Sequence, residues 1–162
     1  MNCIITGGHS GIGLELTKLL IKDGYNLGLI IRNEQRKKDA IEAIGKSSNV
    51  DFFMADLANR DEIEAVAAEI KSKWKSIDIL FNNAGVLLDK LYYSDYGIEL
   101  QLEVNAISPF LLTKNLSSLL NESDSPLVIN TATSGLQKRD LIDISLLKKP
   151  AKFTKLTGSY ID

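Results

Sequence analysis

The sequence has 162 residues, of which 44% are hydrophobic and 25% are charged, close to the average for a globular domain. We therefore expect a single domain over residues 1–162 with a hydrophobic core. The net charge of -2, from 19 basic and 21 acidic residues, indicates no basic surface for nucleic acid and no polybasic segment for membranes. No apolar run approaches the ~18 residues that span a bilayer, so we expect neither nucleic acid nor a membrane as a partner.

Cysteine and histidine usage bears on the compartment and on metal chemistry. Cys3 is the one cysteine and His9 the one histidine of the sequence. A single cysteine excludes an intrachain disulfide and favours a reducing compartment, so we expect a cytoplasmic protein without a secretory signal. With so few thiolate and imidazole groups, we expect no transition-metal site.

Short apolar runs alternate along the chain with longer segments of helical periodicity. The apolar runs that we interpret as strands are 3–5, 27–31, 50–54, 77–81 and 127–131. The segments that we interpret as helices are 13–22, 34–46, 61–74 and 98–120. Near-continuous apolar strands separated by helices indicate a parallel sheet that is covered on both faces. We therefore predict an α/β fold with a doubly wound parallel sheet of the Rossmann type, with five strands visible and the C-terminal strands missing.

Two segments depart from this alternation. Pro109 interrupts the segment 98–120, and a proline inside a helix removes a hydrogen bond, so we expect a bend there. The stretch 135–162 contains six lysines and arginines and no clear strand. We expect it to be a long loop with some helix near 141–147, of the kind that either carries function or is disordered.

A glycine-rich turn lies between the first expected strand and the first expected helix. Residues 6–13 read Thr-Gly-Gly-His-Ser-Gly-Ile-Gly. Glycines allow a tight turn and a close approach of the backbone to a diphosphate, and the helix N-terminus then offers N–H groups and a partial positive charge. The strand–turn–helix context favours a phosphate-binding loop over an ordinary turn. The residues of this turn that we assign to cofactor binding are Thr6, Gly7, His9, Ser10, Gly11, Ile12 and Gly13.

Four further short motifs follow in order. Asp56 and Leu57 follow the third expected strand, 82–85 read Asn-Asn-Ala-Gly after the fourth, Asn105 stands in Val-Asn-Ala, and 128–133 read Val-Ile-Asn-Thr-Ala-Thr. Together with Thr-Gly-x-x-x-Gly-x-Gly in the glycine turn, these motifs resemble the short-chain dehydrogenase/reductase family over essentially the whole chain. Residues 96–113 are similar to its retinol-dehydrogenase and protochlorophyllide-reductase side. By this resemblance, the cofactor-binding residues also include Asp56, Leu57, Asn83, Ala84 and Gly85.

The resemblance implies an oxidoreductase that transfers a hydride between a nicotinamide cofactor and a carbonyl or alcohol substrate. In the family, a tyrosine moves the hydroxyl proton, a lysine four residues later lowers its pKa, a serine binds the substrate oxygen, and an asparagine orders a water. Asn105 matches the asparagine, with a helix-bend asparagine that satisfies the backbone as the alternative. Thr133 falls at the serine position, and Ser134 takes it if the strand ends one residue later. Tyr160 matches the tyrosine, but the lysine position falls beyond Asp162.

The end of the second expected strand bears on the choice of cofactor. An acidic residue there binds the ribose 2′-OH of NAD, whereas an arginine accommodates the 2′-phosphate of NADP. Ile31 occupies the acidic position, Arg32 follows it, and no carboxylate occurs before Glu34. We therefore predict NADP(H) as the preferred cofactor and NAD(H) as the alternative. If Arg32 is only a solvated strand-end residue, this argument fails.

The alternative to an enzyme is a non-catalytic nucleotide-binding or interaction module on the same fold. A full dinucleotide sheet of this type has about six strands, so the fifth strand would expose an apolar edge. Three explanations stay open: the residues belong to a longer enzyme, which we favour; the product is short and inactive; or another chain covers the edge. The family resemblance also implies a homo-oligomer.

Overall fold

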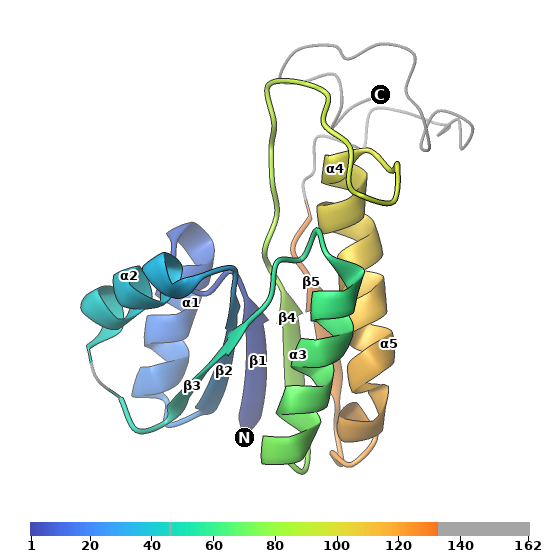
Figure 1. The fold of residues 1–162 in the computed structure, drawn as a ribbon. Helices are drawn as coiled ribbons and strands as arrows, with labels where there is room; N and C mark the ends of the chain where they lie inside the picture. The colour runs from blue at the N-terminus through green and yellow to red at the C-terminus, as the bar shows by residue number, and fades with distance from the viewer. Residues whose placement is uncertain (46, 133–162) are drawn as a thin grey trace.

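The computed structural model describes residues 1–45 and 47–132, which form one parallel sheet with helices on both faces (Figure 1). The strand order is β3-β2-β1-β4-β5, and all four pairings are parallel. The strands are β1 (Asn2–Thr6), β2 (Asn26–Ile31), β3 (Val50–Met54), β4 (Ile79–Asn82) and β5 (Leu127–Asn130). The prediction of a five-stranded parallel sheet of the Rossmann type is confirmed.

The helices divide between the two faces of the sheet, as the predicted doubly wound fold requires (Figure 1). Helices α1 and α2 cover one face, and α3 and α5 pack side by side on the other. The helices are α1 (Gly11–Lys22), α2 (Glu34–Ile44), α3 (Arg60–Lys73), the single turn α4 (Leu100–Leu102), the π-helix η1 (Glu103–Ile107) and α5 (Ser108–Leu120).

The core consists of two layers, one on each face of the sheet. Successive residues of a strand point to opposite faces, so Ile4 packs on the α3–α5 side while Cys3 and Ile5 pack on the α1–α2 side. All three side chains are fully buried. Burial raises the pKa of the Cys3 thiol to about 12, with the negative charge of Asp78 acting in the same direction. Cys3 is therefore a protonated core residue, as its place in an apolar strand suggested.

The segment 98–120 is where the structure differs most from the sequence-based expectation. Helical structure begins at Leu100 and is divided into α4, η1 and α5, with Pro109 as the second residue of α5. Pro109 has no N–H to give to the carbonyl four residues earlier, which belongs to Asn105. The π-helix lies at that point, and its last hydrogen bond runs from the Ser108 N–H to the Glu103 carbonyl. The π-helical turn therefore begins at Glu103 and gives way to α5 just before the proline.

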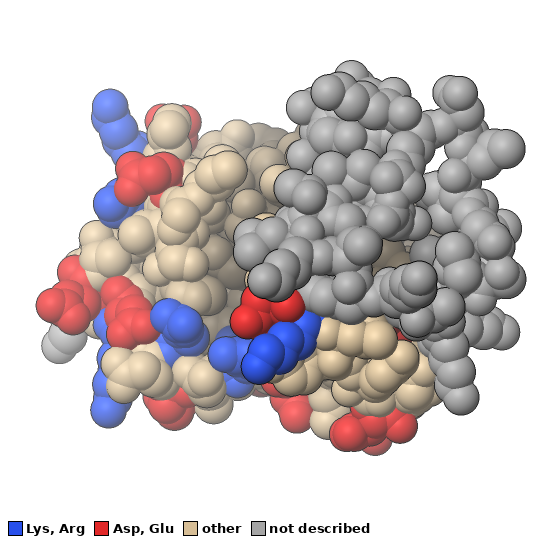
Figure 2. Space-filling model, turned by 90° about the horizontal axis from the view of Figure 1, so that it is seen from above, with Lys and Arg blue, Asp and Glu red and all other residues tan. Residues whose placement is uncertain are grey.

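The surface seen from above carries acidic and basic side chains interspersed over the described residues (Figure 2). No described helix is long and apolar enough to cross a membrane. Within the described ranges, no group of histidine, cysteine, aspartate or glutamate side chains could hold a metal ion.

Candidate functional site

The predicted cofactor residues gather at one edge of the sheet, because the carboxyl ends of parallel strands meet there. The glycine loop follows β1, Arg32 follows β2, Asp56 follows β3 and Asn83 follows β4. Helix α1, which connects β1 to β2, and helix α3, which connects β3 to β4, lie on opposite faces of the sheet, so the strand order reverses between β1 and β4 (Figure 1). The crevice at such a reversal is where open α/β sheets bind ligands.

The glycine loop approaches the β4 turn closely. A Cβ added at Gly13 would lie 2.4 Å from the Gly7 carbonyl oxygen and 2.5 Å from Nδ2 of Asn83, so only glycine fits there. Gly11 has a φ of +53°, and nothing lies within 4 Å of the place where its Cβ would be. The loop is therefore tight toward the protein and open toward solvent, which is the shape that a diphosphate needs.

The N-terminus of α1 carries nothing that would compete with an anion. Its N-cap residue, Ser10, makes no side-chain cap hydrogen bond, and its first turn contains no acidic residue. The N-termini of α2 and α3 are instead capped by Asn33 and Asn59 and carry acidic residues in their first turns. The backbone N–H groups and the positive end of the α1 dipole thus face the open side of the glycine loop.

Thr6 brackets the turn after β4 (the β4 turn, residues 83–85): its hydrogen bonds connect the end of β1 to this turn. Its Oγ1 accepts hydrogen bonds from the backbone N–H groups of Asn83, at 3.0 Å, and Ala84, at 2.9 Å. Nδ2 of Asn83 returns a hydrogen bond of 3.2 Å to the Thr6 carbonyl. The two motifs are therefore held in register by their own side chains.

Asn105 lies in the π-helix and holds the same β4 turn from the other side. Its Oδ1 accepts from the Val86 N–H at 2.8 Å, and its Nδ2 donates to the Val86 carbonyl at 2.9 Å. This paired contact matches the backbone-satisfying interpretation of Asn105. The catalytic role of Asn105 stays a prediction.

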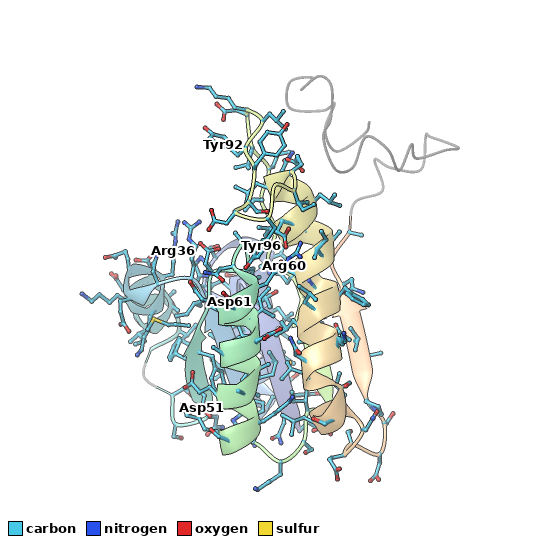
Figure 3. All side chains as sticks on the ribbon, turned by 45° about the vertical axis from the view of Figure 1, so that its right-hand side comes forward. Arg36, Asp51, Arg60, Asp61, Tyr92 and Tyr96 are labelled. Atoms are coloured by element: carbon cyan, nitrogen blue, oxygen red, sulfur yellow. The ribbon has the colours of Figure 1, made fainter. Side chains whose placement is uncertain are left out.

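Positive charge gathers beside the glycine loop at the ends of β2 and α2. Burial lowers the pKa of His9, the positive charges of Arg36 and Arg32 lower it further, and Asp39 opposes them. Nδ1 of His9 is buried without a hydrogen-bond partner in the described part of the chain. Arg32 is exposed and, within the described ranges, forms no ion pair. Figure 3 shows Arg36 at the upper side of α2.

Asp56 and Leu57 form the corner between β3 and α3. Oδ1 of Asp56 accepts from the Ala58 N–H at 2.9 Å, and the Asp56 N–H donates to Oε2 of Glu62 at 2.7 Å. Leu57 is partly buried against the core, and its carbonyl accepts from the Ser108 hydroxyl. The Asp56 carboxylate is thus fixed by its own corner at the open edge of the sheet.

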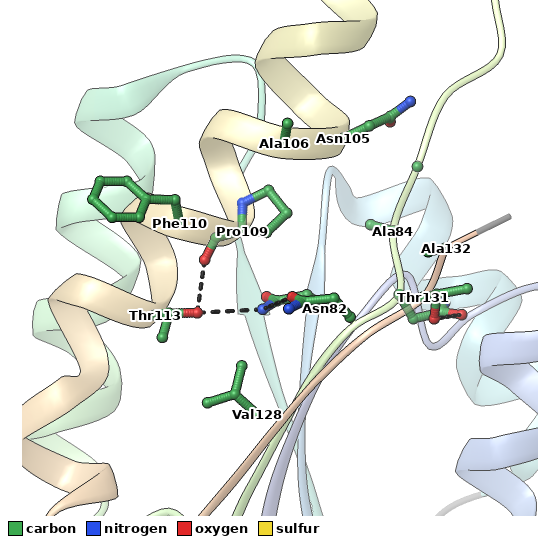
Figure 4. A pocket seen from close by; sticks show the side chains of 13 residues that line it. Asn82, Ala84, Asn105, Ala106, Pro109, Phe110, Thr113, Val128, Thr131 and Ala132 are labelled. Carbon is green, nitrogen blue, oxygen red and sulfur yellow. Dashed lines mark hydrogen bonds between the residues drawn. The ribbon is translucent and has the colours of Figure 1, made fainter. Parts of the chain in front are cut away.

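A hollow with a volume of about 590 Å³ lies between β4, β5 and α5 (Figure 4). Residues 83–85 and Asn105 also line it. Asn82 is only 4% exposed at its floor, and its Nδ2 donates to Oδ1 of Asn130 at 2.9 Å and to Oγ1 of Thr113 at 3.3 Å. Oδ1 of Asn82 has no partner within the described residues. Phe110 and Val128 line the same hollow and are exposed. This region is polar at its floor and apolar at its rim.

Three of the predicted catalytic residues lie outside the described residues. They are Thr133, Ser134 and Tyr160. The structure thus brings Asn105 together with the predicted cofactor residues but does not test the proton-transfer group. The predicted loop 135–162 also lies outside the described residues.

Sequence reasoning missed an ion pair beside Asn105. Arg60, at the start of α3, binds the fully buried carboxylate of Glu103 in the π-helix, 43 residues further along the chain. A glutamate within a helical pattern predicts an exposed position. No local sequence pattern predicts that Glu103 pairs with Arg60. Only the packing of α3 against α5 makes the pair visible.

The comparison with protein-family models agrees with this architecture. The model described as short chain dehydrogenase matches residues 2–140. The chain belongs to the short-chain dehydrogenase family. The family resemblance seen in the sequence motifs is confirmed by this match.

Individual relatives place the chain within that family. It is 32% identical over 162 residues to a short-chain dehydrogenase/reductase of Armillaria gallica, covering 96% of this chain and 52% of that protein. It is 33% identical to retinol dehydrogenase 11 of Mus musculus, covering 82% of this chain and 43% of that protein. The chain therefore spans about half the length of the curated relatives it matches.

Solved structures confirm the fold. A short-chain dehydrogenase of Shigella flexneri, crystallised in complex with NADP, superposes with a TM-score of 0.74 at 22% sequence identity. The alignment covers 99% of this chain and 64% of that one.

Proposed function

We propose that this chain is the dinucleotide-binding part of an oxidoreductase that transfers a hydride between NADP(H) and a carbonyl or alcohol substrate. The glycine loop carries the proposal. It is open at Gly11, tight at Gly13, and backed by the uncapped N-terminus of α1. Hydride-transfer chemistry is the general activity of the family to which the chain belongs.

The residues present fit a dinucleotide. The glycine loop and the N–H groups of α1 would hold the diphosphate, and the Asp56 carboxylate would hold the adenine. The exposed guanidinium of Arg32, with Arg36 nearby, would neutralise a 2′-phosphate, and this favours NADP(H) over NAD(H). When bound, the nicotinamide ring supplies the group that gives or takes the hydride.

The proton would be handled by the chain's own side chains. By family resemblance, Tyr160 gives or takes the hydroxyl proton, and Thr133 or Ser134 binds the substrate oxygen. Asn105 would hold the relay beside them, and its paired contact with Val86 keeps the β4 turn in place while it does so. A phenol needs a neighbouring cation to transfer a proton near neutral pH.

The test is the ratio of affinities for NADP⁺ and NAD⁺, measured by calorimetry on the 162-residue chain. The wild type is expected to bind NADP⁺ about 10- to 100-fold more tightly, because a charge-assisted phosphate contact contributes about 1.5–3 kcal/mol. Arg32→Ala should bring the ratio close to one. Lys38→Ala, which removes an exposed charge from α2, is the matched control and should leave the ratio unchanged. Tighter binding of NAD⁺ by the wild type would overturn the cofactor assignment.

A second candidate is an interaction module on the same fold. The observation that favours it is the exposed apolar surface at β5 and α5, where Leu127 is 49% and Phe110 is 65% exposed. Edges of this kind pair with other chains. Sedimentation velocity over a wide concentration range would test this candidate. Concentration-dependent association, together with no dinucleotide binding at any concentration, would favour it over the enzyme.

The homo-oligomer and the cytoplasmic location remain predictions. The oligomer rests on family resemblance, and the same sedimentation experiment tests it. The location rests on the single cysteine, and imaging of the tagged protein in cells tests it.

A further inference from the structure

The Glu103 carboxylate is buried where a charged group is normally excluded. Its side chain has no exposed surface, and it lies inside the π-helix η1, two residues before Asn105. Oε1 accepts from Nε of Arg60 at 2.7 Å and Oε2 from Nη2 at 2.9 Å, a two-pronged contact. The hydroxyl of Ser94 donates to Oε2 at 3.3 Å. Burying a carboxylate is costly unless such partners satisfy it, so Glu103 depends on Arg60 and Ser94.

Arg60 ties the same carboxylate to the loop that follows β4. The Tyr96 ring lies 4.3 Å from the guanidinium carbon of Arg60, and the Tyr96 hydroxyl accepts from the Arg60 backbone N–H at 3.0 Å. Figure 3 shows Arg60 and Tyr96 together above the N-terminus of α3. Hydrogen bonding to Glu103 raises the pKa of Arg60, so Arg60 keeps its positive charge.

The π-helix is clamped a second time at its other end. The Ser108 hydroxyl is shared between the carbonyls of Leu57 and Glu103. Both clamps therefore reach the β3–α3 corner, which carries Asp56 just before Leu57. Asn105 lies between the clamps, and its side chain holds Val86.

We propose that Glu103 is a positioning residue: held by Arg60, it fixes the π-helical turn and thereby places Asn105 on the turn after β4. Three segments far apart in the sequence, around residues 56–60, 83–96 and 103–108, then move as one unit. Because the turn after β4 is also bracketed by Thr6, the Glu103–Arg60 pair connects the adenine side of the proposed cofactor site with the opposite side.

The direct test is amide hydrogen exchange followed by NMR. In the wild type, the Val86 N–H is protected by its hydrogen bond to Asn105. Glu103→Gln should speed exchange at Val86 about tenfold or more, and at Ile5 in the centre of the sheet by less than about twofold. Asn105→Ala removes the acceptor and sets the maximum effect at Val86. Equal acceleration at Val86 and Ile5, or none at either, would overturn the proposal, since a purely structural role lowers protection everywhere.

Two further variants keep the test decisive. Arg60→Lys retains a positive charge beside Glu103 but loses the two-pronged contact, so it should show the same pattern at about threefold, even if Glu103→Gln fails to fold. Glu69→Gln breaks the exposed Glu69–Lys73 pair on the same helix α3 and should leave exchange at Val86 unchanged. An effect of Glu69→Gln as large as that of Arg60→Lys would contradict a specific role for Glu103.

A binding experiment extends the inference and rests on the proposed function. Glu103→Gln should weaken NADPH binding about fivefold, and binding of adenosine 2′,5′-bisphosphate, which lacks the nicotinamide half, by less than about twofold. Equal weakening of both would contradict the positioning role. If the wild type binds neither ligand, the proposed function fails, while the exchange experiment still decides the role of Glu103.

Discussion

The two sides of the upper sheet edge differ in how deeply their strands are buried. Beside β1 and α1, Thr6 brackets the β4 turn, Gly13 packs against the Gly7 carbonyl, and the neighbouring strand residues are buried. Beside β5 and α5, Asn82 leaves a buried oxygen without a partner in the described ranges, and Phe110 is 65% exposed. Each side leaves one buried polar atom without a partner in the described ranges, Nδ1 of His9 on the first and Oδ1 of Asn82 on the second, but β1 is buried whereas β5 is largely exposed and offers a surface for contact.

This difference divides the proposed function between the two sides of the sheet edge. In the proposed function, dinucleotide binding would draw on the first side, so we expect it in the 162 residues alone. Catalysis and substrate choice would draw on the second side and on the predicted residues Thr133, Ser134 and Tyr160.

The largest expected contrast lies within helix α5. Leu112 is fully buried and Phe110 is 65% exposed, two residues away. Leu112→Ala should lower the free energy of unfolding by about 3 kcal/mol, because it leaves a cavity in the core. Phe110→Ala should lower it by about 0.5 kcal/mol or less. Urea unfolding followed by circular dichroism measures both, and a similar cost for the two would mean that the Phe110 side is packed after all.

Two glycines of equal backbone strain distinguish the phosphate loop from an ordinary turn. Gly11 and Gly24 have φ angles of +53° and +79°, and each has open space where a Cβ would lie. Changing either to alanine should cost about 1 kcal/mol of stability, since L-residues disfavour this conformation. Gly11→Ala alone should also weaken NADP⁺ binding about tenfold or more, by placing a methyl group where the diphosphate approaches. Equal binding by the two variants would place the ligand elsewhere.

The amino end of the sheet should show a pH-dependent contribution from Asp78. Its carboxylate accepts from the Ser123 hydroxyl at 2.6 Å and from the Asn2 N–H at 2.7 Å, and these contacts hold its pKa below the ordinary 3.8. A lowered pKa stabilises the fold above the unfolded-state value and loses that effect as the pH falls through the folded-state value. Asp78→Asn should cost about 1 kcal/mol at pH 7, where the carboxylate is partly exposed and screened, and less below about pH 4. A gap that stays constant with pH would exclude this role.

The reactivity of Cys3 reports how firmly β1 is held in the sheet. A fully buried thiol with a pKa of about 12 carries almost no thiolate at pH 8. Ellman's reagent should therefore react with the native protein at least about 100-fold more slowly than with the urea-unfolded chain. Rapid reaction in the native state would mean that β1 opens readily, against the deep burial of that strand.

Much of the fold could be predicted from the sequence because buried parallel strands leave a strong local signal. The run 50–54 is reproduced as β3 without change, and 27–31 differs from β2 by one residue. Strand β4 begins at Ile79 rather than at residue 77, since the Ile77 N–H bonds to the Leu119 carbonyl instead of joining the sheet. The π-helix was not predicted, because i→i+5 hydrogen bonds have no sequence pattern of their own.

The site could be predicted only where its motifs are contiguous. The glycine loop and the β4 turn each lie in one short segment, and the structure brings them together through Thr6. The pair of Arg60 and Glu103 depends on the contact between two helices far apart in the sequence, which no local pattern encodes. The structural contact of Asn105 also needed coordinates, since its partner is the backbone of Val86.

The most direct test of the account is an NMR titration of the 162-residue chain with NADP⁺, mapped residue by residue. We predict the largest shifts of the amide signals in the glycine loop 7–13, with further shifts at Arg32, Asp56 and residues 83–85. Little change is expected in α5 around Phe110. Shifts centred on Phe110, Thr113 and Val128, or no shifts at saturating NADP⁺ and NAD⁺, would contradict the claim that the glycine loop binds the dinucleotide.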